Sequence, residues 1–133
     1  MENLFIEATT KTPQVSFDSA TGVLLVKGRS IPKDAEAFWN PVLEWFAGYM
    51  KTPHQHTTIR IDLEYFNISS SKCLLLLLYK LNDLKTLGHQ SVVEWYYNAD
   101  DMDMFEVGQD YAFMVKVPFE FKKQAQDELA MVV

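Results

Sequence analysis

The chain has 133 residues, of which 48% are hydrophobic and 14% aromatic. This composition excludes a disordered protein, and together with the length it predicts one folded domain spanning residues 1–133. Its net charge of −6 argues against nucleic-acid binding, which depends on lysine and arginine side chains that meet phosphates. With a single cysteine, no visible signal peptide and no apolar run near the ~20 residues of a membrane span, we expect a cytoplasmic protein with no membrane partner.

The first part of the sequence predicts a group of strands followed by a helix. The expected strands are residues 4–8, 13–18 and 23–27, of which the last two form a β-hairpin. Asp34 is expected to cap a helix that runs to about Lys51, because apolar residues recur there at steps of three and four. Pro41 predicts either a kink in this helix or a fresh start capped by Asn40.

In the remainder, single helices alternate with strands. The expected strands are residues 57–64, 91–97 and 115–121, and the expected helices are residues 70–87 and 100–114. Gly88 is expected to end the first of these helices, and Pro118 to place the last strand at a sheet edge. Met102 and Phe105 are expected to face the core, and residues 124–133 form a tail with room for one helical turn.

The strand at 57–64 indicates how the layers are arranged. One side carries Thr57, Ile59, Ile61 and Leu63, and the other carries Thr58, Arg60, Asp62 and Glu64. A parallel strand buried on both faces would be apolar throughout, so this strand is expected to be buried on one face only. Strands joined by single helices usually lie parallel through right-handed crossovers. We therefore predict an α/β fold with a mixed sheet of about five or six strands and three main helices mostly on one face.

The junction between this strand and the following helix reads Asn67-Ile-Ser-Ser-Ser-Lys72. Hydroxyl groups at a helix N-terminus lie beside free N–H groups and the positive end of the helix dipole, where a phosphate is tolerated. The turn therefore indicates a hydroxyl switched by phosphorylation, although the same serines would also serve as ordinary helix caps worth about 1 kcal/mol. Lys72 lies where the dipole disfavours a cation, so it either meets an anion or is simply solvated.

Three segments together resemble a known family over nearly the whole chain. They are Ile59-Arg-Ile-Asp-Leu with the turn through Lys72, the strand Val93-Glu-Trp-Tyr-Tyr97, and the helix carrying Phe38, Trp45 and Phe46. The sequence resembles the SiaC-type regulatory phosphoproteins of bacteria, which are STAS-like relatives of the anti-sigma-factor antagonists.

This resemblance implies a STAS-like domain with a non-enzymatic role in bacterial signal transduction and biofilm control. In such families a protein kinase phosphorylates the turn hydroxyl, and a PP2C-like, metal-dependent phosphatase removes the phosphate. The unphosphorylated form binds an effector such as a diguanylate cyclase, and no cofactor is implied.

The turn departs from the family pattern at one position. Directly after Asn67, where the family usually carries threonine or serine, this chain has Ile68. Ser69 is then the expected phosphoacceptor and Ser70 the second choice. The remaining residues of the turn are expected to contact the partner; they are Asn67, Ile68, Ser71 and Lys72.

Other polar groups give no sign of catalysis or of a metal site. His54, His56 and His89 match no zinc-binding spacing, and the stretch Asp100-Asp-Met-Asp103 lacks the glycine of a calcium loop. No nucleophile, phosphate-loop or dinucleotide motif is present, so we expect a non-enzyme without metal. Two alternatives stay open: a small anion- or ligand-binding α/β domain or enzyme that uses the turn, and a plain protein-interaction domain that has lost the switch.

Overall fold

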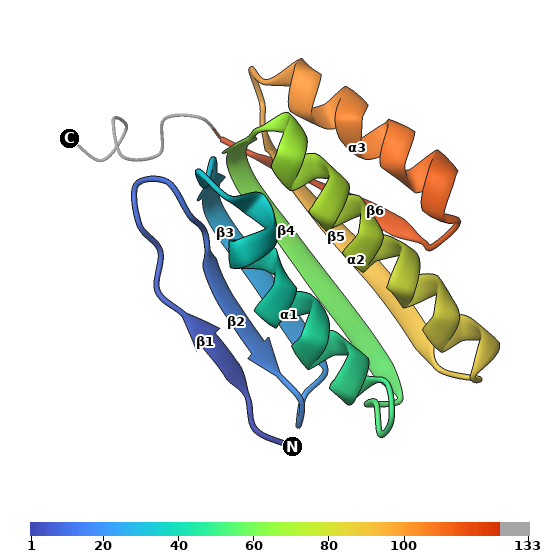
Figure 1. Ribbon diagram of the computed structural model, residues 1–133. Coiled ribbons are helices and arrows are strands. Elements are labelled where there is room, and N and C mark those ends of the chain that lie inside the picture. The colour runs from blue at the N-terminus through green and yellow to red at the C-terminus, as the bar shows by residue number, and fades with distance from the viewer. Residues whose placement is uncertain (126–133) are drawn as a thin grey trace.

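The computed structural model describes residues 1–125, and Figure 1 shows a sheet with helices packed across one of its faces. The strands are β1 (Leu4–Ile6), β2 (Gln14–Asp18), β3 (Val23–Ser30), β4 (His56–Phe66), β5 (Gln90–Asn98) and β6 (Phe119–Gln124). The helices are α1 (Ala35–Tyr49), α2 (Ile68–Thr86) and α3 (Met102–Val115). Most of the predicted tail, residues 126–133, lies outside the described residues.

The six strands form one mixed sheet whose spatial order follows the chain, β1-β2-β3-β4-β5-β6. Strands β1, β2 and β3 pair antiparallel, whereas β3 to β6 pair parallel, each connection carrying a single helix. The predicted fold class is therefore confirmed. Strand β6 lies at a sheet edge directly after Pro118, as predicted.

The helices cover the sheet face predicted from β4. Its alternate residues Thr57, Ile59, Ile61 and Leu63 are buried beneath the helices, and Arg60 and Glu64 are exposed on the other face. The core between helices and sheet is built from large aliphatic and aromatic side chains. Its largest fully buried members include Trp39, Phe46, Leu74, Leu77, Leu78 and Trp95. Burial of this apolar surface is the main stabilising contribution to the fold.

The ends of α1 and α2 follow the predicted capping chemistry. Asp34 accepts a hydrogen bond from the Ala37 N–H, and α1 continues through Pro41, so the alternative of a fresh start capped by Asn40 is wrong. Beyond α2, Gly88 has φ +87° and its N–H donates to the Lys85 carbonyl. This is the left-handed C-terminal cap that glycine adopts without strain.

The predicted inward face of α3 and the predicted last strand are both partly wrong. Met102 is 51% exposed, and Met104 and Tyr111 are buried instead, because Asp101 caps the helix and sets its rotation. The last strand begins at Phe119, because α3 continues to Val115 and Lys116 then adopts a left-handed conformation with φ 56°. The three-residue connection at 116–118 was not visible in the sequence.

Gly108 fits α3 closely against the sheet. A Cβ at this position would lie 2.6 Å from Cδ1 and Nε1 of Trp95, which is fully buried and donates a hydrogen bond to the Met104 carbonyl. Glycine has a weak helix propensity, but at this position it allows close contact between α3 and the indole ring.

We predict that Gly108→Ala destabilises the protein by about 1–3 kcal/mol, because overpacking outweighs the gain in helix propensity. Gly48→Ala in α1 is the matched control, since its Cβ would meet only the flexible end of Met1 at 3.1 Å. The control is expected to be neutral or stabilising. Urea unfolding of both variants measures the difference, and equal stability of the two would contradict this account.

Candidate functional site

The turn between β4 and α2 is a capped helix start. The Asn67 side-chain oxygen accepts from the Ser70 N–H at 2.8 Å, and its carbonyl accepts from the Ser71 N–H at 2.9 Å. Asn67 is therefore the N-cap, and the interpretation of the serines as caps is wrong. The helix begins at Ile68, two residues before the predicted start, because an asparagine in extended conformation satisfies the same N–H groups.

The three serines of the first helical turn have different environments. Ser69 is exposed, whereas Ser70 is only 1% exposed. Ser71 is half-buried, and its hydroxyl donates to the Ile68 carbonyl at 2.6 Å. Of the two predicted phosphoacceptors, only Ser69 is open to solvent in this conformation.

Ser70 belongs to a buried chain of hydrogen bonds that joins three elements. Its hydroxyl oxygen accepts from the Ser30 hydroxyl at 2.7 Å, and the Trp39 indole N–H donates to Ser30 at 3.3 Å. The Ser30 carbonyl accepts from the Asn67 N–H at 3.0 Å. These contacts fix the start of α2 on β3 and α1, so the backbone of the turn is held in one position.

The exposed part of the turn is apolar as well as polar. Ile68 is 79% exposed and Tyr65, at the end of β4, is 52% exposed. Exposed apolar side chains of this size are available for contact with another protein. Ile68 therefore lies at the surface and carries no packing role.

An open cleft of about 610 Å³ separates the starts of α1 and α2. It is lined by Lys33, Asp34, Ala35, Glu36, Ser69, Lys72 and Cys73. The two lysines are opposed by two carboxylates, so the cleft as it stands is not a strongly cationic anion site. Burial, and then the Glu36 carboxylate, raises the pKa of the Cys73 thiol, which keeps it protonated and unreactive.

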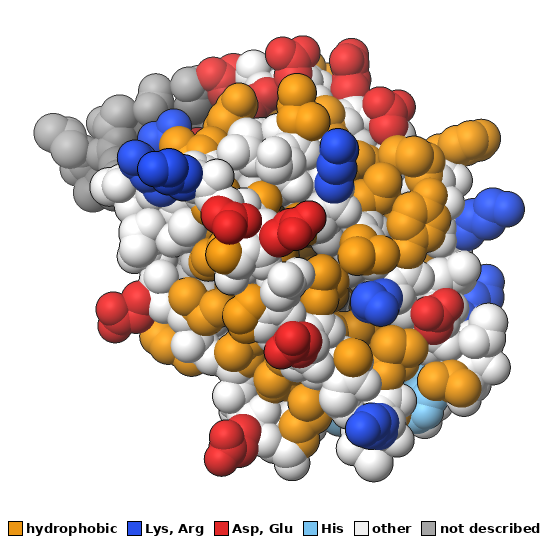
Figure 2. Space-filling view, in the orientation of Figure 1, with side chains coloured by type: hydrophobic (Ala, Val, Ile, Leu, Met, Phe, Trp, Pro, Cys, Tyr) orange, Lys and Arg blue, Asp and Glu red, His pale blue; other side chains and the backbone are white. Residues whose placement is uncertain are grey.

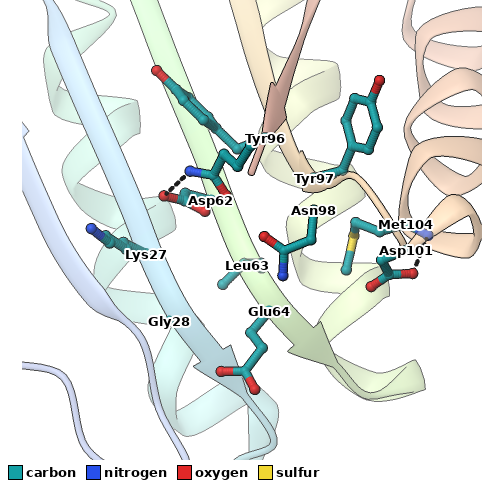
Figure 3. A pocket seen from close by; sticks show the side chains of 11 residues that line it. Lys27, Gly28, Asp62, Leu63, Glu64, Tyr96, Tyr97, Asn98, Asp101 and Met104 are labelled. Atoms are coloured by element: carbon teal, nitrogen blue, oxygen red, sulfur yellow. Dashed lines mark hydrogen bonds between the residues drawn. The ribbon is translucent and has the colours of Figure 1, made fainter. Parts of the chain in front are cut away.

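A second cavity, of about 280 Å³, lies where β4 and β5 separate (Figure 3). The two strands pair only as far as Ile61 and Trp95, after which β4 stays with β3 and β5 stays with β6. Gln124 donates to Asp62 at 3.3 Å across the gap, and Asp101 accepts from the Met104 N–H. Sequence reasoning missed this cavity because it depends on strand register, although Asp62 and Glu64 were predicted to face away from the helices.

Residues 1–125 contain no cluster of three or more histidine, cysteine or carboxylate side chains placed to hold a metal ion. The His54 ring instead accepts from the His56 N–H at 3.1 Å within its own loop. In the same residues no helix is both long and apolar enough to cross a membrane.

The mixed sheet, the helices on one face and the hydroxyl-bearing strand-to-helix turn together define a mixed α/β domain with a capped helix start at its exposed turn. A family model described as SiaC family regulatory phosphoprotein matches residues 6–124. The chain belongs to this family. The predicted resemblance and the non-enzymatic class are therefore confirmed, and the alternative of a small enzyme is set aside.

Known proteins of Pseudomonas aeruginosa are similar to this chain. An uncharacterised protein of strain UCBPP-PA14 is 26% identical over 128 residues, which cover 96% of this chain and all of the relative. The structure of SiaC has a TM-score of 0.85 at 22% identity, covering 93% of this chain and all of that one. The structure of SiaC in complex with the diguanylate cyclase SiaD, which SiaC activates, has a TM-score of 0.84 at 23% identity, covering 91% of this chain and 99% of that one.

Proposed function

We propose that this protein is a cytoplasmic partner-switching regulator whose binding to a diguanylate cyclase is controlled by phosphorylation of Ser69. A protein kinase adds the phosphate, and a PP2C-like phosphatase removes it. The observation that carries the proposal is the exposed Ser69 hydroxyl in the first turn of α2. Membership of a family of regulatory phosphoproteins supports it, and so does the similarity of the fold to SiaC bound to SiaD.

The surroundings of Ser69 can accommodate a phosphate. The group would lie at the N-terminus of a 19-residue helix, where the dipole and free N–H groups favour negative charge. Lys33 and Lys72 line the cleft that Ser69 borders, beside Asp34 and Glu36, and are the cations of that cleft with which a phosphate on Ser69 would pair. Modification should therefore leave the fold intact and change only the surface.

The phosphate would lower the affinity for the partner because it lies beside an apolar contact. Ile68 and Tyr65 are the exposed apolar groups of the turn, and they are expected to be covered by the bound effector together with Asn67, Ser71 and Lys72. A phosphate adds roughly −1.5 to −2 charge at pH 7. Removing that charge from water next to an apolar contact is costly, so the unmodified form is the binding form.

Phosphorylation by the cognate kinase is expected to add one phosphate to the intact mass, and Ser69→Ala should abolish the gain. Ser70→Ala is the control, because the buried Ser70 is not accessible to a kinase in the folded protein. Mass spectrometry of the intact protein and its peptides measures both. A phosphate that persists in Ser69→Ala, or its absence from the wild type in every growth condition, counts against the assignment.

A second candidate function is a plain interaction domain without a switch. The observation that favours it is Ile68, which occupies the position where the family usually carries threonine or serine. In that case the turn would bind its partner in all conditions. Phosphoproteomics of the native protein distinguishes the two, since only the switch requires a phosphorylated fraction.

A further inference from the structure

Helix α3 carries a row of carboxylates along its solvent side. Asp103, Glu106 and Asp110 are exposed and follow one another at steps of three and four, so they lie on one stripe of the helix. The sequence from Met102 to Val115 contains no lysine or arginine. Figure 2 shows acidic side chains along the upper edge of the molecule, over α3.

This row is not compensated by cations of the described residues. The ion pairs that form within residues 1–125 are Arg60 with Glu94 and Lys122 with Glu120, on the sheet. Like charges three and four residues apart destabilise a helix by a few tenths of a kcal/mol per pair. Asp103 gains from the helix dipole in the first turn, but Glu106 and Asp110 lie beyond it. The fold itself therefore gains nothing from these two charges.

Apolar side chains continue the same surface. Phe113 lies three residues after Asp110 on the same stripe and is 86% exposed, and Met114 beside it is partly exposed. The neighbouring helix α2, which packs against α3, exposes Tyr79. Figure 2 shows hydrophobic side chains gathered at the right, over α2 and α3, just below the acidic row.

We propose that this acidic–apolar face binds a basic protein surface whose apolar side chains are flanked by lysine and arginine. The face consists of Asp103, Glu106, Asp110, Phe113, Met114 and Tyr79. Charge complementarity selects this occupant, because anionic lipid and nucleic acid are repelled by the carboxylates. A second copy of the chain, with net charge −6, presents the same carboxylates and is repelled too.

The inference deepens the proposed function, on which it rests, by naming a second surface for the effector. The carboxylates would steer a basic partner and raise the association rate, and the apolar side chains would hold it after contact. The phosphate acts elsewhere, at the apolar contact of Ile68 and Tyr65 on the turn. Attraction along α3 and exclusion at the turn are thus separate effects on one complex.

An NMR titration of the whole protein with an amphipathic leucine–lysine peptide tests the face directly. We expect amide shifts that cluster on α3 and the exposed side of α2, and an affinity that falls as salt is raised. A leucine–glutamate peptide of equal length should not bind. Asp103→Asn combined with Glu106→Gln and Asp110→Asn should weaken binding at least tenfold, and so should Phe113→Ser.

The matched control removes three exposed carboxylates at the other edge of the molecule, through Glu2→Gln, Glu7→Gln and Glu44→Gln. It should change the affinity less than twofold. Absence of binding, shifts centred on the sheet face, or equal loss in the control would each overturn the proposal. Because the probe is a peptide and Ser69 is unmodified, these results are independent of whether the phosphorylation switch exists.

Discussion

Ser69→Asp is expected to bind the effector at least tenfold more weakly than the wild type, a loss of about 1.4 kcal/mol. The substituted carboxylate lies next to Ile68, which is 79% exposed and would be covered in the complex. Placing an unpaired charge against an apolar contact removes it from water without compensation. The melting temperature should change little, because a negative charge in the first turn of α2 is favoured by the helix dipole.

Calorimetry and thermal melts with a diguanylate cyclase of the same genome measure this effect. Ser69→Ala is the control and should bind as the wild type does, since it removes the hydroxyl without adding charge. Equal affinities for Ser69→Asp and Ser69→Ala would refute the switch and leave the plain interaction domain standing. A lost affinity accompanied by a lowered melting temperature would show that the variant unfolds, and not that its charge prevents the effector from binding.

The same substitution one residue later is expected to act on stability rather than on binding. Ser70 is 1% exposed and accepts the hydrogen bond of Ser30, so Ser70→Asp would place a carboxylate inside the contact between α2 and β3. A buried charge without a cationic partner costs about 3 kcal/mol or more. That is a large part of the ~5–15 kcal/mol that stabilises a domain of this size.

Denaturant unfolding at two pH values separates this explanation from a purely steric one. Burial raises the pKa of a carboxyl group, so the penalty should be present at pH 7 and decrease as acid protonates the group. Ser70→Ala, which adds no charge, should cost only about 1 kcal/mol from the hydrogen bond that Ser30 loses. A Ser70→Asp protein as stable as the wild type at pH 7 would show that the turn rearranges freely.

The sheet could be predicted from the sequence because its signals are local. The alternation along residues 57–64 revealed the buried face, and single helices between strands revealed the parallel pairing. The hydroxyl-bearing turn was also visible, because Asn67 and three serines interrupt two apolar segments. Alternation along a strand, and polar residues between apolar segments, can be recognised without knowing which distant residues they contact.

The features that sequence reasoning missed depend on distant contacts. Ser70 is buried because Ser30, forty residues earlier, lies opposite it, and no local pattern distinguishes Ser70 from the exposed Ser69. The rotation of α3 follows from Asp101 as its cap and from the fit of Gly108 against Trp95. Gly108, a residue with weak helix propensity, is thus the one that allows close packing of α3 on the sheet.

The separation of β4 from β5 has a mechanical consequence. The turn that bears Ser69 is an extension of the β3–β4 pair, whereas α3 is attached to the β5–β6 pair. Beyond Ile61 the backbone ladder does not join these two halves, so a displacement of one is not transmitted rigidly to the other through the sheet. Transmission between them falls to side-chain contacts. Phe66 of β4 packs edge-on against Trp95 of β5, Gln124 donates to Asp62 across the gap, and α2 packs on α3, where Tyr111 donates a 3.5 Å hydrogen bond to the Ser71 carbonyl.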